Sequence, residues 1–154
     1  MQRIRRHYVT VKGERQVHYR RAGVGPAFVL MHESPLSSQS LERLVGALAD
    51  RFTVFALDTP GYGNSDPLVD FEQPEIEDYA YAAADTVEAL GIESCAVYGA
   101  HTGAAIALEL ASSRPDLVTA AVLDGLPVFT SIERDELLGR YLPAFEPSED
   151  GSHL

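Results

Sequence analysis

Residues 97–105 decide the fold, and they read Val97-Tyr98-Gly99-Ala100-His101-Thr102-Gly103-Ala104-Ala105. An apolar run ends within this stretch and a run of small, helix-forming residues begins, so the pattern predicts a strand that turns directly into a helix. Such a turn requires small neighbours, which Gly99 and Gly103 supply, and it forces its apex residue, His101, into a strained backbone conformation. We therefore expect the His101 side chain above the carboxyl edge of a sheet, where open α/β sheets bind ligands.

Strands and helices alternate on both sides of this turn. A hairpin is expected over residues 3–11 and 15–21, followed by buried strands at 27–31, 52–57, 95–98 and 118–123. Apolar residues at helical spacing predict helices over about 41–48, 76–90, 102–114 and 132–142. The first helix has Ser37 and Ser38 as candidate N-caps, and the last has Thr130 and Glu133 as a candidate capping box. The sequence therefore predicts the α/β class: a mainly parallel, doubly wound sheet with an N-terminal antiparallel hairpin.

Composition and charge limit the classes of function. A chain of 154 residues with 45% hydrophobic and 23% charged residues suits one globular core. The net charge of −11 is uneven, because most of the bases fall within residues 1–21, where we expect them on the solvated face of the hairpin. The part of the chain after residue 21 is strongly acidic, which argues against a nucleic-acid partner. With no signal-peptide pattern, no membrane-spanning run and Cys95 as the single cysteine, we expect a cytoplasmic protein without disulfides.

Three motifs in a fixed order carry a resemblance to a known family. His32-Glu33-Ser34-Pro35 is similar to an H-G-x-P loop, and residues 58–66 are similar to a D-x-x-G-x-G-x-S-D turn. The turn at His101 has the form G-x-H-x-G where G-x-S-x-G is usual. With these motifs the chain resembles the α/β-hydrolase family from about residue 3 to its end. The resemblance implies a core over residues 1–124, truncated after about the sixth strand, and the beginning of a cap over residues 125–154.

The resemblance also implies roles for individual residues. Family members perform acyl transfer or related chemistry, and the amides of Ser34 and Thr102 correspond to their oxyanion hole. Asp124 is a candidate acid partner or, equally, a turn residue before Gly125. His101 is either a working imidazole, as general base or as nucleophile, or the relic of a lost nucleophile. Two residues of the H-G-x-P-like loop, His32 and Glu33, are candidate substrate-binding residues, although a loop histidine is often structural.

The function expected from these residues is hydrolysis of a small ester-like or related carbon substrate. The alternative is a catalytically inactive member of the family, either a ligand binder or a remnant. A histidine base without a serine also permits proton abstraction from a carbon acid. The spacing of the remaining histidines predicts no metal site, and no cofactor motif is found.

A small-molecule substrate is expected, without nucleic acid or membrane. The apolar strand at 118–123 would form an unpaired sheet edge, which predicts self-association or a second chain that completes the sheet.

Overall fold

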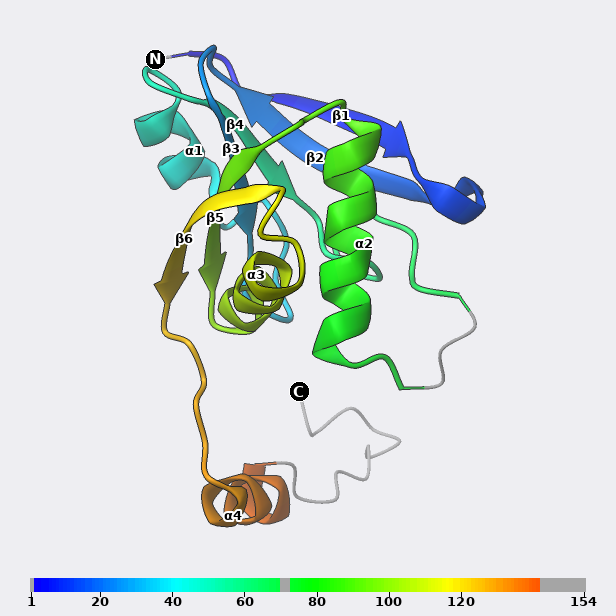
Figure 1. Ribbon diagram of the computed structural model, residues 1–154, viewed down its shortest axis with the longest axis vertical. Helices are drawn as coiled ribbons and strands as arrows, with labels where there is room; N and C mark the ends of the chain where they lie inside the picture. The colour runs from blue at the N-terminus through cyan, green and yellow to red at the C-terminus, as the bar shows by residue number, and fades with distance from the viewer. Residues whose placement is uncertain (1, 70–72, 142–154) are drawn as a thin grey trace, which may run out of the picture.

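A single mixed sheet organises the chain. The computed structural model describes residues 2–69 and 73–141, and the six strands lie in the order β1-β2-β4-β3-β5-β6 (Figure 1). The antiparallel pair β1 and β2 is joined by a 3-10 turn, η1, and β2 runs antiparallel to β4, whereas β4, β3, β5 and β6 are parallel. The strands are β1 (Arg5–Thr10), β2 (Gln16–Ala22), β3 (Ala27–Met31), β4 (Thr53–Leu57), β5 (Cys95–Ala100) and β6 (Val118–Asp124), and η1 spans Lys12–Glu14. The predicted α/β architecture with its N-terminal hairpin is confirmed.

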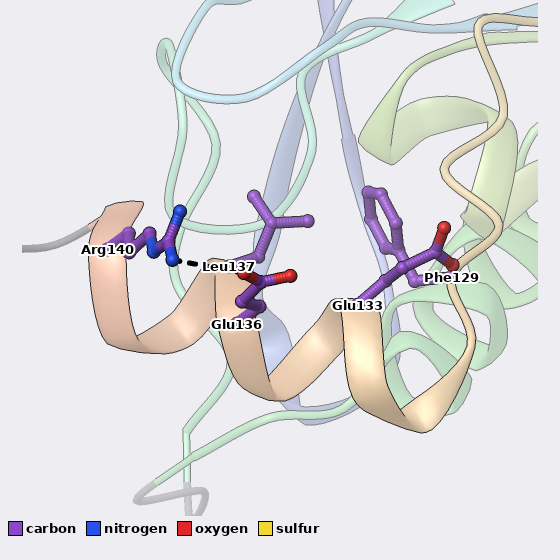
Figure 2. A pocket seen from close by; sticks show the side chains of 5 residues that line it. All are labelled: Phe129, Glu133, Glu136, Leu137 and Arg140. Atoms are coloured by element: carbon purple, nitrogen blue, oxygen red, sulfur yellow. Dashed lines mark ion pairs between the residues drawn. The ribbon is translucent and has the colours of Figure 1, made fainter.

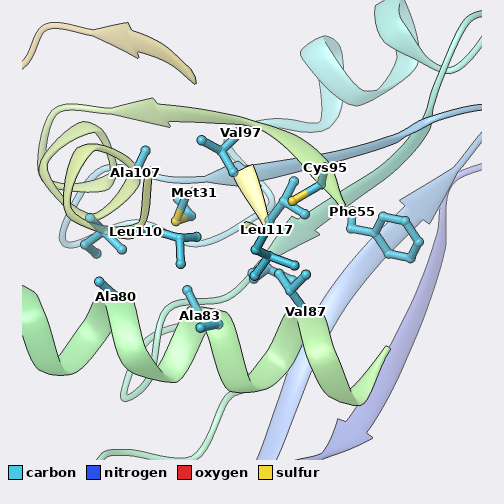
Figure 3. Packing of buried hydrophobic residues seen from close by; sticks show 14 of the residues in the cluster. Met31, Phe55, Ala80, Ala83, Val87, Cys95, Val97, Ala107, Leu110 and Leu117 are labelled. Carbon is cyan, nitrogen blue, oxygen red and sulfur yellow. The ribbon is translucent and has the colours of Figure 1, made fainter. Parts of the chain in front are cut away.

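Helices cover both faces of the parallel strands. The helices are α1 (Glu42–Leu48), α2 (Ile76–Ala89), α3 (Thr102–Ser113) and α4 (Ser131–Tyr141). Figure 3 shows the face under α2 and α3, where Ala83 and Leu110 meet Met31 and Val97 of the sheet. On the opposite face Leu30 and neighbouring strand residues pack against α1. The strands β3, β4 and β5 are apolar on both sides because both of their faces are covered, whereas most residues of β6 are exposed. Each fully buried aliphatic side chain contributes roughly 1.5–3 kcal/mol.

The helix ends test two predicted caps. The Thr130–Glu133 capping box is confirmed, because each residue accepts a hydrogen bond from the other's backbone amide. The predicted N-cap at Ser37 or Ser38 is wrong: α1 begins at Glu42, and no side chain caps it. Ser38 points instead into the interior, where a buried carboxylate accepts its hydrogen bonds. The expected end of the last helix at 142, and the stretch from there to 154, lie outside the described residues.

The expectation that the hairpin bases are all solvated is wrong for two of them. Arg15 and Arg20 are buried. The guanidinium of Arg20 donates to the carboxylate of Glu42 at 2.9 Å and to the hydroxyl of Ser38 at 2.8 Å. Arg20 is buried because α1 and the segment before it supply acceptors on that face of the hairpin.

A buried carboxylate, that of Asp58, joins three separate parts of the chain. It follows β4 and is only 1% exposed. It accepts hydrogen bonds from the amide and hydroxyl of Ser38, from the amide of Asn64 at 2.8 Å, and from His18 Nδ1 at 2.8 Å. Burial alone would raise the pKa of Asp58, but these hydrogen bonds outweigh it and hold the pKa below its ordinary value. Asp58 therefore fixes β2 and the loops after β3 and β4 relative to one another.

Replacing Asp58 with asparagine should destabilise the protein by about 3–5 kcal/mol, because buried donors lose their charged acceptor. The folded-state pKa of Asp58 is lowered, so its contribution is complete above the unfolded pKa of about 3.9 and is lost as the pH falls through the folded value. The difference in unfolding free energy between wild type and Asp58→Asn should therefore be constant from about pH 7 to 5 and shrink below about pH 4. Urea unfolding at several pH values measures it.

The matched control is Asp50→Asn, which removes an exposed carboxylate. This change should alter stability by no more than about 0.5 kcal/mol at any pH. An Asp58→Asn variant as stable as the control would contradict the proposed role of this carboxylate, and so would a deficit that is the same at pH 3 and pH 7.

Candidate functional site

The apex of the strand-to-helix turn is His101, which lies between β5 and α3. Its backbone has φ 48° and ψ −109°, a left-handed conformation that a residue with a side chain adopts at a cost of roughly 1–3 kcal/mol. A Cβ on Gly99 would overlap the carbonyl oxygen of Gly103, and a Cβ on Gly103 would overlap the carbonyl oxygen of Met31. Both glycines are therefore required for α3 to start this close to β3 and β5.

The imidazole of His101 is exposed and lies beside the end of β6. The His101 amide donates a hydrogen bond to the Asp124 carbonyl oxygen at 2.8 Å. The ring lies over Gly125, where an added Cβ would be 3.0 Å from His101 Cε1. Gly125 also has φ +63°, so a side chain there would be strained as well as crowded. These two constraints leave the imidazole in open contact with solvent above the carboxyl edge of the sheet.

The carboxylate of Asp124 is bound by a residue that the sequence analysis missed. The hydroxyl of Tyr98 donates to Asp124 Oδ2 at 2.8 Å. Burial raises the pKa of Tyr98 to about 12, and the hydrogen bond to Asp124 and the charge of Glu33 act in the same direction. The phenol is therefore protonated at any working pH. The alternation of side chains along a strand could have predicted this contact. Tyr98 and Ala100 lie on the same face of β5, and Ala100 is paired with Asp124.

The loop after β3 contains the other predicted residues. His32 is buried; its Nδ1 donates to the Glu33 carbonyl oxygen at 2.8 Å, and its Nε2 accepts from the Thr59 amide at 3.0 Å. Both ring nitrogens are thus engaged within the protein. Glu33 is half-buried, and its carboxylate accepts a weak hydrogen bond from the Ser40 hydroxyl at 3.4 Å. Because β3, β5 and β6 are parallel neighbours, this loop, His101 and Asp124 all follow strands at the same edge of the sheet.

Two backbone amides near this edge have no partner among the described residues. Neither the Ser34 nor the Thr102 amide donates a hydrogen bond within residues 2–69 and 73–141. Thr102 is the first residue of α3, where the amides of the first turn have no intrahelical acceptor and the helix dipole favours negative charge. These amides are therefore available to an oxygen atom that carries developing charge.

Apolar side chains follow the site in the sequence and form a recess with α4. A cavity of about 380 Å³ is lined by Phe129 and Leu137 together with Glu133, Glu136 and Arg140. Figure 2 shows Phe129 and Leu137 projecting from the same side of α4 and its approach, with an ion pair between Arg140 and Glu136. Phe129 also borders a second hollow, of about 300 Å³, with Leu108 of α3. Figure 1 shows α4 lying beyond the carboxyl end of β6 and joined to it by an extended segment.

Other chemical possibilities find little support in the described part of the chain. No group of three or more His, Cys, Asp or Glu side chains there is arranged to hold a metal ion. Nor does any of its helices combine the length and apolar character needed to cross a bilayer. Cys95 is buried, and burial raises the pKa of its thiol to about 11, so the reactive thiolate is scarce at neutral pH.

Comparison with known proteins gives consistent relatives. The sequence model of the alpha/beta hydrolase fold matches residues 26–150. The chain is 33% identical over 126 residues to a soluble epoxide hydrolase of Corynebacterium sp. (strain C12), covering 80% of this chain and 43% of that protein. It is 32% identical over 108 residues to haloalkane dehalogenase 2 of Mycobacterium bovis, covering 70% of this chain and 37% of the relative. The chain thus spans less than half the length of these curated relatives.

A solved structure agrees with these sequence matches. The crystal structure of E-2-(acetamidomethylene)succinate hydrolase superposes with a TM-score of 0.78 at 28% identity, covering 96% of this chain and 54% of that one. The sheet order, the turn at His101 and these matches lead to one conclusion. The chain belongs to the α/β-hydrolase fold family.

Proposed function

We propose that the protein hydrolyses a small, largely apolar ester-like or related carbon substrate, with His101 at the position of the family's nucleophile. The observation that carries the proposal is the exposed imidazole of His101 at a strained apex. The amides of Ser34 and Thr102, which have no acceptor in the part of the chain that the structure describes, lie at the ends of elements that reach the same sheet edge. An imidazole supplies a base, and backbone amides supply an oxyanion hole that persists whatever side chains surround it.

In the proposed reaction His101 acts as a general base. Its unprotonated ring nitrogen takes a proton from water as the water oxygen bonds to the carbonyl carbon of the ester. The negative charge that develops on the carbonyl oxygen is stabilised by the Ser34 and Thr102 amides, at roughly 3–4 kcal/mol for each donor. The tetrahedral intermediate then breaks its bond to the alcohol oxygen, which takes the proton back from the imidazolium.

A nucleophilic route uses the same atoms in a different order. The unprotonated ring nitrogen of His101 attacks the carbonyl carbon, and the bond to the alcohol oxygen breaks as that oxygen takes the proton from the other ring nitrogen. Water then cleaves the neutral acyl-imidazole to the carboxylic acid and returns a proton to the imidazole. In both routes His101 carries positive charge at an intermediate stage, and a carboxylate that approaches the ring during the reaction would stabilise that charge. We propose Asp124, which ends the strand next to β5, as this acid partner.

The surroundings of the apex support an apolar substrate. Leu126, Val128 and Phe129 follow Gly125 directly in the sequence and line the hollow beside α3. We assign the segment from 125 onward to the beginning of a cap, and the core to residues 1–124. Of the two loop residues, Glu33 borders the substrate in this proposal, and His32, with both nitrogens engaged, holds the loop.

Replacing His101 with alanine should lower kcat/KM for short alkyl esters at least about 100-fold, because general-base catalysis contributes roughly 10²–10⁴. The substrates should be unactivated esters such as ethyl butanoate, since free imidazole cleaves activated esters without an enzyme. Terminal epoxides and chloroalkanes of similar size belong in the same screen, because relatives of the chain are named for such substrates. The matched control is His7→Ala, which removes an imidazole from β1.

Full turnover by His101→Ala would contradict the assigned role of the imidazole. Intact mass spectrometry of the enzyme during turnover separates the two routes, since an acylated protein supports nucleophilic attack and its absence supports the general base. Binding without turnover is the second candidate function, favoured by the lack of a hydroxyl, thiol or carboxylate at the apex. It would be supported by substrate binding with no hydrolysis by wild type.

We also propose that the 154-residue chain associates through the edge of β6 that pairs with no other described strand. This strand is last in the sheet order, and Thr119, Ala120, Ala121 and Val122 are exposed. An exposed strand edge with small and apolar side chains pairs readily with another chain. Light scattering after size exclusion should give a molecular mass of at least twice the 16.7 kDa of one chain.

A lysine on the edge strand should weaken this association, because charge on an edge opposes strand pairing. We expect Val122→Lys to shift the protein towards monomer and the control Val128→Lys, outside the strand, to leave the mass unchanged. A monomeric wild type at all concentrations up to about 100 µM would contradict the proposal, since a specific interface normally forms at micromolar concentrations.

A further inference from the structure

The ring of His32 lies buried between two backbone groups that determine which of its nitrogens carries the proton. Nδ1 lies 2.8 Å from the carbonyl oxygen of Glu33, and Nε2 lies 3.0 Å from the amide nitrogen of Thr59. A carbonyl oxygen only accepts hydrogen bonds and an amide only donates them, so Nδ1 carries the proton and Nε2 is the acceptor. The ring is 1% exposed, and the ring of Tyr62 meets it edge-to-face. The surroundings therefore select the Nδ1–H tautomer.

The hydrogen bond from His32 sets the orientation of the next peptide group. The Glu33 carbonyl oxygen accepts a second hydrogen bond, from the Leu36 amide at 3.0 Å, which closes a turn. The carbonyl of Glu33 and the amide of Ser34 belong to one planar trans peptide unit, so these two groups point in opposite directions. Because the carbonyl is directed at the His32 ring and at the inside of the turn, the Ser34 N–H bond points away from both.

The loop that carries this amide begins against the first turn of α3. A Cβ on Gly103 would overlap the carbonyl oxygens of both Met31 and His32. The backbone therefore leaves β3 beside the start of α3, whose first residue is Thr102. In the proposed function the amides of Ser34 and Thr102 bind one oxygen atom. The direction of the Ser34 amide then affects the chemical step.

We propose that His32 is a positioning residue, whose Nδ1–H holds the Glu33 carbonyl so that the Ser34 amide points out of the turn, where it can donate to a substrate oxygen. Thr59 acts one step earlier, because its amide engages Nε2 and so keeps the proton on Nδ1. Thr59 directly follows Asp58, whose carboxylate is fixed by donors from three segments. His32 itself touches no substrate. The kinetic consequences rest on the proposed function, whereas the tautomer and the peptide orientation do not.

The variants His32→Phe and His32→Asn separate the hydrogen-bond donor from the ring. Phenylalanine fills the space and donates nothing, whereas the side-chain amide of asparagine can place an N–H near the position of Nδ1. His32→Phe should lower kcat about 100-fold with little change in KM, because a misdirected oxyanion donor is missed mainly in the transition state. His32→Asn should keep kcat about ten-fold above that of His32→Phe, as one recovered hydrogen bond implies.

Full activity of His32→Phe would overturn the inference, and so would equal losses in the two variants. The matched control is His7→Phe, which replaces an imidazole on β1 by the same ring and should leave kcat unchanged.

Residual dipolar couplings test the inference without turnover, because the coupling of an amide depends on the direction of its N–H bond. In aligned ¹⁵N-labelled protein, the Ser34 coupling should change in His32→Phe and return towards its wild-type value in His32→Asn. The Thr102 coupling, which α3 determines, should stay constant in both variants. An unaltered Ser34 coupling in His32→Phe would overturn the inference even in an active enzyme.

The histidine ¹⁵N spectrum of wild type tests the first step even if His32→Phe fails to fold. The His32 proton should be on Nδ1, and a proton on Nε2 would overturn the inference. If wild type hydrolyses no substrate while the tautomer and the Ser34 couplings are as expected, the proposed function fails and the positioning role of His32 stands.

Discussion

The buried carboxylate of Asp58 is the interaction on which the surrounding structure depends. A carboxylate removed from water costs several kcal/mol unless hydrogen-bond donors replace the solvent. Here Ser38, Asn64 and His18 provide those donors from three separate segments. The loop after β3 and the turn after β4 must therefore adopt the conformations that bring these donors to Asp58. The position of the Ser34 amide relative to the sheet edge follows from that requirement, because Ser34 belongs to the same loop.

A second constraint acts at the turn between β5 and α3. His101 occupies a strained backbone conformation, and the neighbouring glycines allow α3 to approach the carbonyl oxygens of Met31 and Gly103. Apolar packing of α3 against the sheet and α2 offsets the strain. The consequence is an exposed side chain next to a helix amide that donates to no acceptor within residues 2–69 and 73–141. In the proposed mechanism the first acts as base and the second stabilises the oxyanion, so the strained turn brings both groups to one point.

The sequence alone could predict the features that depend on near neighbours. Strand and helix periodicity, the Thr130–Glu133 capping box and the strained position of His101 all follow from residues a few positions apart. The features that it missed join residues distant in sequence. The bond between His18 and Asp58 spans 40 residues, and that between Tyr98 and Asp124 spans 26. Local rules favour a serine as the N-cap of α1, where the hydroxyl would accept a hydrogen bond from an exposed helix amide. The Ser38 hydroxyl instead donates to the buried carboxylate of Asp58, and a hydrogen bond to a charged acceptor is the stronger of the two.

In the proposed mechanism the Ser34 and Thr102 amides and the His101 imidazole form one site for a tetrahedral intermediate and its negatively charged oxygen. The most direct measurement is an amide ¹H–¹⁵N titration with an alkyl trifluoromethyl ketone, whose hydrate mimics the tetrahedral intermediate. We expect the Ser34 and Thr102 amide protons to move downfield together, with the same binding curve as the His101 ring signals. If these amides do not respond while the ketone binds elsewhere, or if they respond with different affinities, the site described here is not the site of chemistry.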